Sequence, residues 1–186
     1  MSETAHLHLF HGTDLKYVQS ILNVGFVCRE NKEHWLGNGI YFFIEKDVAR
    51  WWTTKPSRKF GSKIKNPAVV ECDMYIQREK LIDTTVLADY NRLDELSREF
   101  VIEYFNSVSD EEPITAYNLR CLLFNWLFKE KDYFAFKVPF TLSKRPYCDA
   151  DFSLVHDLSI QYNEIQVCLR EDQQRLLYNK KICDAT

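Results

Sequence analysis

Three short segments of the chain carry side chains that could act together on a nucleotide. Residues 10–13 read FHGT, residues 37–43 read GNGIYFF, and residues 162–169 read YNEIQVCL. They place a His-Gly pair, an aromatic ring and a carboxylate on three separate apolar segments. Imidazole nitrogens and carboxylates bond sugar hydroxyls, and aromatic rings stack on flat bases. Such a set is suited to gripping a dinucleotide and breaking a bond to its ribose.

In the first segment, Gly12 directly follows an apolar strand pattern. Because glycine has no Cβ, a ligand can approach this backbone closely, and its N–H and C=O can pair with a planar amide. His11 offers a ring nitrogen to a ribose hydroxyl. The structural alternative is a partly buried histidine at a strand end, followed by a glycine that makes a turn.

The second segment carries Tyr41 on a strand, and Trp52 follows eleven residues later in a helical pattern. Two aromatic rings that face each other across a slot suit a flat cationic ring. Trp51 takes the place of Trp52 if the helix register differs by one. The alternative for all three rings is ordinary core packing.

The third segment is a strand that shows Glu164 and Gln166 to one face and apolar residues to the other. A carboxylate that enters an apolar strand needs a partner, such as a sugar hydroxyl. Alternatively, Glu164 sits at an exposed strand start and meets water.

Hydrophobic periodicity predicts the elements that must position these groups. Strands are expected at 6–11, 39–44, 68–76, 81–86, 152–156 and 164–169, and helices at 14–23, 45–52, 91–107, 114–128 and 171–178. Thr13 or Asp14 is expected to cap the first helix and Gly25 to end it. Residues 132–150 contain Pro139 and Pro146 and are expected to be irregular. The pattern predicts one α+β domain over residues 1–186.

The composition narrows the class of protein. The chain has 186 residues, 46% of them hydrophobic and 27% charged, as in ordinary globular domains. A net charge of −3 gives no global indication of nucleic acid or an acidic membrane. No run is long enough to span a bilayer, and no signal peptide is expected. The six cysteines lack a CxxC pair, which argues against disulfides and structural zinc and for a reduced, cytoplasmic protein without a metal.

Taken in order, the motifs resemble the ADP-ribosyltransferases of the poly(ADP-ribose) polymerase and diphtheria-toxin type. Their signature is a His, a Tyr and usually a Glu on three strands. The likeness covers FHGT, GNGIYFF with an aromatic eleven residues on, and a strand that begins NE; residues 68–83 also look like the family's strand after the tyrosine motif. The resemblance implies a split mixed or antiparallel β-sandwich with flanking helices.

The resemblance also implies roles in binding NAD. His11 would bond the adenosine ribose, and Gly12 would clamp the nicotinamide amide through its backbone. Tyr41 would stack on the nicotinamide ring, with Trp52, or Trp51 in the other register, as the second wall. Glu164 would hold the 2′-hydroxyl of the nicotinamide ribose and stabilise the cationic sugar that forms as nicotinamide leaves.

Two further positions belong to the expected NAD contacts, Thr13 and Gln166. The chain departs from the family's pattern at Ala49, where a serine often precedes the second aromatic by three residues. Related proteins can carry glutamine as the third residue, so Gln166 competes with Glu164. We prefer Glu164 because it begins the strand directly after Asn163.

The implied reaction is transfer of one ADP-ribose from NAD to a macromolecular acceptor, either nucleic acid or protein. The implied role is that of a bacterial toxin or defence effector, which an inhibitory partner protein would accompany. Residues 141–153 would hold the acceptor-recognition loop. A basic stretch directly after the expected slot could meet an acceptor's phosphates, or it could be a solvated loop or grip the pyrophosphate of NAD. Its candidate acceptor contacts are Arg50, Lys55, Arg58, Lys59 and Lys63.

Three rival functions remain open from the sequence. The first is a non-catalytic module that binds NAD or ADP-ribose. The second is a cysteine-dependent hydrolase built on Cys148 and His156. The third is a protein-interaction domain, in which the order of the three motifs would have no functional cause.

Overall fold

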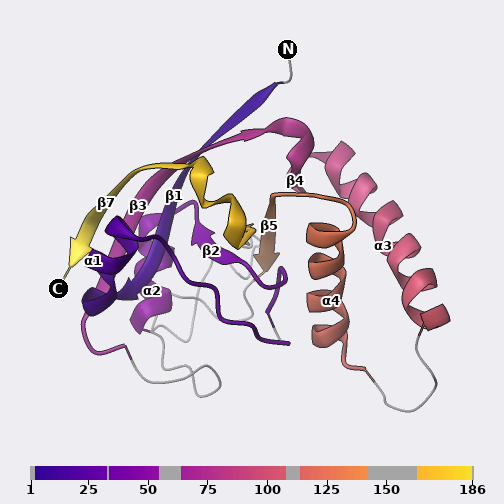
Figure 1. Cartoon of the computed structure of the whole chain (residues 1–186), viewed down its shortest axis with the longest axis horizontal. Helices are drawn as coiled ribbons and strands as arrows, with labels where there is room; N and C mark the ends of the chain where they lie inside the picture. The colour runs from indigo at the N-terminus through magenta and orange to yellow at the C-terminus, as the bar shows by residue number, and fades with distance from the viewer. Residues whose placement is uncertain (1–2, 33, 55–63, 108–113, 142–162, 186) are drawn as a thin grey trace, which may run out of the picture.

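The computed structural model describes residues 3–32, 34–54, 64–107, 114–141 and 163–185. Within them, seven strands form one sheet in the order β4-β5-β6-β2-β1-β3-β7 (Figure 1). Neighbouring strands run antiparallel except β4 and β5. The strands are β1 (Thr4–Asp14), β2 (Ile40–Phe43), β3 (Pro67–Gln77), β4 (Leu81–Asp83), β5 (Ala135–Thr141), β6 (Asn163–Leu169) and β7 (Leu177–Ala185).

The helices among these residues confirm the expected α+β class. They are α1 (Leu15–Asn23), α2 (Lys46–Thr54), α3 (Leu87–Ser107) and α4 (Ala116–Lys129), with short 3₁₀ turns η1 (Arg78–Lys80) and η2 (Glu171–Leu176). Asp14 caps α1, because its side chain accepts from the Lys16 N–H. Gly25 follows the helix with a φ of 121°, a conformation that favours glycine.

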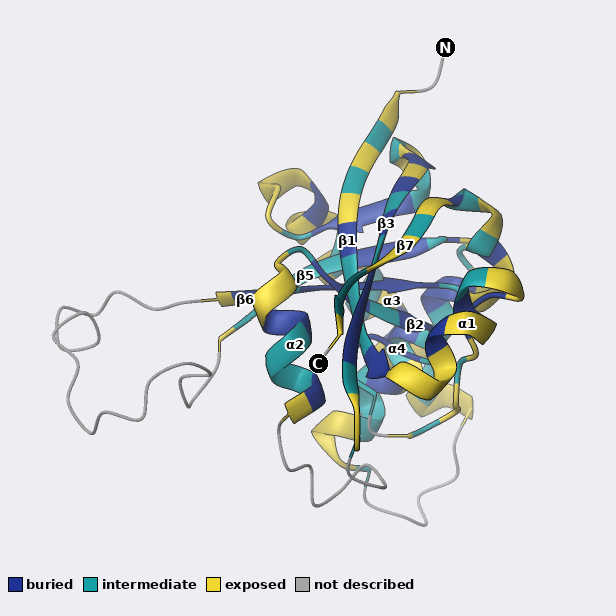
Figure 2. Cartoon of the chain, turned by 90° about the vertical axis from the view of Figure 1, so that its left-hand side faces the viewer, coloured by how far each residue is buried: buried dark blue, intermediate teal, exposed yellow. Residues whose placement is uncertain are grey.

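The helices cover both faces of the sheet. Ile40 and Phe42 of β2 pack in one cluster with α1, whereas Phe43 packs in another with α2. On β6, Val167 joins the α1 cluster and Cys168 joins the cluster under α3 and α4. Since neighbouring strand residues face opposite ways, α1 lies on one face and α2 and α4 lie on the other. Figure 2 shows the buried residues of the sheet between them.

The sheet divides between β1 and β2. These strands pair at one position, Phe10 with Phe43, whereas β1 pairs with β3 from Thr4–Gln77 to Asp14–Pro67. The strands β4-β5-β6-β2 and β1-β3-β7 therefore form two groups that meet at one point.

Two sequence-based expectations are wrong. Residues 135–141 form β5 and are not irregular. Pro139 is tolerated because β4 ends opposite Lys137, so the proline lies where β5 has no paired neighbour on that side in the described chain. The expected helix at 171–178 is only the η2 turn, and the chain then continues as β7 along β3. The expected strand at 152–156 lies outside the described residues.

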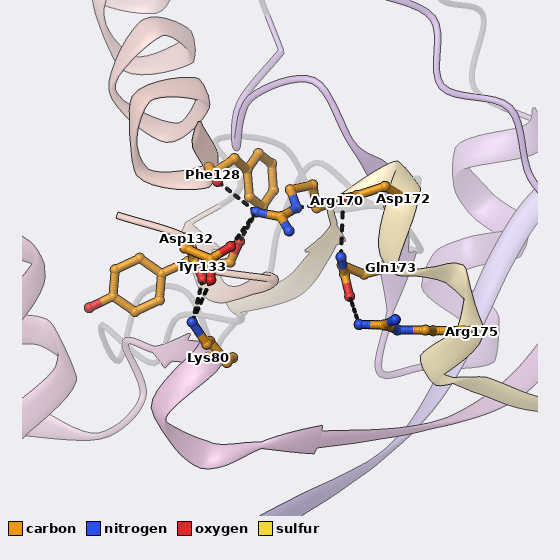
Figure 3. Close-up of polar contacts among 8 residues, drawn as sticks. All are labelled: Lys80, Phe128, Asp132, Tyr133, Arg170, Asp172, Gln173 and Arg175. Carbon is orange, nitrogen blue, oxygen red and sulfur yellow. Dashed lines mark hydrogen bonds and ion pairs between the residues drawn. The ribbon is translucent and has the colours of Figure 1, made fainter. Parts of the chain in front are cut away.

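An ionic cluster fastens the end of α4 to β6 (Figure 3). Arg170 donates to the Phe128 carbonyl at 2.7 Å and to the Asp132 carboxylate at 3.0 Å. Lys80 donates to the other oxygen of Asp132 at 2.6 Å. Asp132 has a φ of 52°, which is unfavourable for a residue with a Cβ. The two cations hold the turn in this conformation.

We predict that Arg170→Met lowers the free energy of unfolding by about 2–3 kcal/mol, because it removes charged hydrogen bonds and leaves the carbonyl and carboxylate acceptors without their donor. Arg175→Met is the matched control, since Arg175 makes one hydrogen bond in Figure 3, to Gln173 at 3.3 Å. Urea titrations of both variants measure the difference. Equal losses in the two variants would contradict the role given to Arg170.

Candidate functional site

His11 joins the two groups of strands. Its Nδ1 lies 2.7 Å from the carbonyl oxygen of Tyr41. Because a carbonyl only accepts, Nδ1 carries the proton and Nε2 keeps a lone pair. Phe26 and Phe42 meet the ring edge-on, at centroid distances of 4.9 and 5.7 Å. Burial lowers the pKa of His11 and outweighs the Tyr41 carbonyl, which raises it. The imidazole is therefore neutral at pH 7, with Nε2 as an acceptor.

The hydroxyl of Tyr41 is engaged by the loop before β2. It donates to the Gly37 carbonyl at 2.9 Å and accepts from the Leu36 N–H at 2.7 Å. The His34 ring lies 5.5 Å from the tyrosine ring, tilted by 59°. Burial raises the pKa of Tyr41, so the phenol stays protonated. The hydroxyl of Tyr41 is therefore protonated and engaged by the loop on both its donor and acceptor sides.

Glu164 is a fully buried carboxylate on β6. One oxygen accepts from the Trp52 indole N–H at 3.0 Å, and the other accepts from the Gln166 amide. A buried charge requires such partners. The expected alternatives for the third residue of the signature, Glu164 and Gln166, are thus direct neighbours in one hydrogen-bonded cluster.

Trp52 lies between this carboxylate and other aromatic rings. Its ring stacks on Phe43 at 6.0 Å and 19°, and it meets Trp35 edge-on at 6.2 Å. Trp51 meets Trp52 edge-on at 5.5 Å. Trp52 is thus the indole that contacts Glu164, and Trp51 is its neighbour.

Gly12 has a structural role that the sequence did not reveal. A Cβ at this position would lie 2.4 Å from the Ala49 carbonyl oxygen and 2.6 Å from the Thr53 methyl group. Glycine is therefore required for α2 to lie this close to β1. The next residue, Thr13, is buried at the end of the strand.

His11, Tyr41 and Glu164 lie on β1, β2 and β6, three adjacent strands at the centre of the sheet. Their side chains do not share one face. His11 packs with Phe26 and Phe42 on the α1 face, whereas Tyr41 packs under α4 on the opposite face. Glu164 contacts Trp52 of α2 on that second face. His11 and Tyr41 therefore lie on the two strands that meet at the division, on opposite faces, and Glu164 lies one strand further on, on the face of Tyr41.

Of the candidate acceptor contacts, Arg50 forms an ion pair with Asp184 of β7. Its charge is thus already compensated. Outside the described residues lie the other four basic candidates and the residues of the rival hydrolase: Lys55, Arg58, Lys59, Lys63, Cys148 and His156.

The sequence reasoning missed Arg120 of α4. Its guanidinium carbon lies 5.4 Å from the Trp35 ring and 5.6 Å from the Phe140 ring. Its Nε and Nη2 are buried, and no described residue accepts a hydrogen bond from them. The only indication in the sequence was a lone arginine inside the apolar stretch of 116–128.

No cluster of three or more His, Cys, Asp or Glu side chains in the described part of the chain could hold a metal ion. Among the described helices, none combines the length and apolar character that a membrane crossing requires.

Comparison with known proteins gives little further information. No family model matches the chain, and no solved structure matches it. The chain is similar to an uncharacterized protein, MJ0359, of Methanocaldococcus jannaschii, with 28% identity over 86 residues. The aligned part is 46% of this chain and 40% of that protein.

We predict that His11 makes the free energy of unfolding depend on pH. Its pKa is lower in the folded chain than the ordinary 6.5, so the unfolded state binds more protons as the pH falls below that value. Stability is therefore complete above it and is lost as the pH falls toward the folded pKa. His11→Gln does not titrate and can still donate to Tyr41, so it should flatten this dependence.

Denaturant titrations between about pH 7.5 and pH 5.5 measure the slope, to which one proton adds at most about 1.4 kcal/mol per pH unit. Burial also lowers the pKa of His34, so His34→Gln serves as the comparison variant. We expect the free energy of unfolding to depend less steeply on pH in His11→Gln than in His34→Gln. A wild-type slope in His11→Gln would show that His11 is not the responsible group.

Proposed function

We propose that the chain is an NAD-dependent ADP-ribosyltransferase that moves one ADP-ribose to a macromolecular acceptor and releases nicotinamide. The observation that carries the proposal is the placement of His11, Tyr41 and Glu164 on three adjacent strands where the sheet divides. The division into two groups of strands also fits the split β-sandwich that the sequence resemblance implies.

In this proposal, NAD lies across the division of the sheet. The Nε2 of His11 accepts from a hydroxyl of the adenosine ribose, since Nδ1 is already bonded to Tyr41. The nicotinamide ring stacks on Tyr41, whose hydroxyl is occupied by the preceding loop. Because His11 and Glu164 lie on opposite faces, the dinucleotide reaches both only at the point where β1 and β2 part.

The transfer step breaks the bond between C1′ of the ribose and the nicotinamide nitrogen. The bonding electrons go to that nitrogen, so nicotinamide leaves neutral and the ribose becomes oxocarbenium-like. A carboxylate beside the sugar stabilises this charge more in the transition state than in the ground state. An acceptor oxygen or nitrogen then bonds C1′ and loses its proton. Glu164 supplies the carboxylate, and Gln166 holds it in place.

One observation favours a second candidate, a non-catalytic module that binds NAD or ADP-ribose. Glu164 has no exposed surface, and the indole of Trp52 bonds it directly. For transfer, Trp52 must move before a ribose hydroxyl can reach the carboxylate. In a binding module, the contact would simply persist as part of the core.

We predict that Glu164→Gln lowers the rate of nicotinamide release from NAD by on the order of 100-fold or more, with a much smaller effect on NAD affinity. The substitution keeps the size of the side chain and an oxygen that can accept from Trp52. Glu95→Gln, on the exposed surface of α3, is the control and should behave as wild type. Chromatographic detection of nicotinamide gives the rate, and calorimetric titration gives the affinity.

An unchanged rate of nicotinamide release in Glu164→Gln would show that Glu164 does not act in the transfer step. Gln166 would then be the candidate for that role. NAD binding without any nicotinamide release by the wild-type chain, with and without cell extract as a source of acceptor, would support the binding module.

A further inference from the structure

Arg120 is a half-buried cation, and two of its nitrogens are buried without a hydrogen-bond partner among the described residues. Its guanidinium carbon lies 5.3, 5.4 and 5.6 Å from the ring centres of Tyr117, Trp35 and Phe140. Nε and Nη2 are shielded from solvent, and within the described ranges they have no hydrogen-bond acceptor. Aromatic rings attract a guanidinium but offer no lone pair in the plane of its N–H groups.

This arrangement is costly for the chain alone. An arginine stays charged in proteins, and its buried N–H groups require hydrogen-bond acceptors. Burial lowers the pKa of Arg120, and the groups that raise it again are Tyr117, Tyr41 and Cys121, none of them a carboxylate. An oxyanion that accepts two parallel N–H bonds would satisfy the guanidinium.

The position of Arg120 suggests which molecule brings that oxyanion. Arg120 packs on Phe140 of β5, and Phe140 is paired with Glu164 of β6. His11 lies on β1, beyond β2 on the other side of β6. A dinucleotide extended from Glu164 toward His11 would lead across β2 and away from β5. In that pose, an oxyanion at Arg120 would come from a second molecule that approaches Glu164 from the β5 side.

We propose that Arg120, with Trp35 and Tyr117, forms a subsite that binds a phosphate of single-stranded nucleic acid. Arginine matches phosphate with a bidentate fork, and unpaired bases stack on aromatic rings beside it. The Tyr117 side chain is 59% exposed and can take such a base. A carboxylate of an acidic protein would accept from the guanidinium of Arg120 but would not stack on the rings of Trp35 and Tyr117. That this nucleic acid is the ADP-ribose acceptor rests on the proposed function, whereas the need of Arg120 for an oxyanion does not.

Fluorescence anisotropy with a fluorescein-labelled, mixed-sequence single-stranded DNA oligonucleotide, and with its RNA equivalent, tests the subsite on the full chain. Arg120→Met should weaken binding by about tenfold or more. It should also reduce the slope of log affinity against log salt by about one. Arg120→Lys, a point charge without the fork, should fall between Arg120→Met and wild type.

Two further variants guard against effects on folding. Arg92→Met is the matched control, because Arg92 also lies over a ring, 5.0 Å from the centre of Tyr133, but on α3. It should bind as wild type. Tyr117→Ala changes an exposed ring and should weaken binding by about fivefold or more through lost base stacking.

Oligonucleotide binding that is the same in wild type, Arg120→Met and Tyr117→Ala would overturn the inference. Binding of a labelled glutamate-rich peptide that depends on Arg120, with no binding of either oligonucleotide, would also overturn it and assign a carboxylate ligand. The assay contains no NAD, so its result is separate from nicotinamide release. Arg120-dependent binding by a chain that never releases nicotinamide would reject the transferase and keep the subsite.

Discussion

The hydrogen bond from the His11 imidazole to the Tyr41 carbonyl stands where backbone pairing between β1 and β2 stops. A side chain therefore spans the division of the sheet and links the two groups of strands. The same bond fixes the tautomer and directs the lone pair of Nε2 away from Tyr41. Gly12, the next residue, lets α2 lie directly on β1 at this point. One contact thus links the two groups of strands and fixes the tautomer of His11.

A second constraint is the set of polar side chains on the face of the sheet that α2 and α4 cover. Glu164, Gln166 and Arg120 lie among aromatic rings, where burial of charge is costly. Glu164 is compensated by Trp52 and Gln166, but the buried nitrogens of Arg120 have no such partner among the described residues. Apolar residues would fill this face at lower cost, so stability alone does not explain its charges.

Much of the fold follows from local patterns, and much of the site does not. Alternation and helix caps located β1, α1, β3 and β6, and alternation also placed Glu164 and Gln166 on one face. The presence of Pro139 argued against a strand at β5. Only the position of β4 shows that the missing N–H of Pro139 costs no hydrogen bond. The contact between Trp52 and Glu164 depends on how α2 docks, and sequence spacing carries no such information. The need for Gly12 arises from the same docking.

We propose that His11 bridges the division of the sheet through Nδ1 and offers Nε2 to a bound dinucleotide. Nitrogen-15 NMR of the histidine side chains, recorded near neutral pH with and without NAD, tests it most directly. We expect a neutral His11 ring protonated at Nδ1, with a bare Nε2 whose resonance moves when NAD is added. A ring protonated at Nε2, or an Nε2 resonance that ignores saturating NAD, would contradict it.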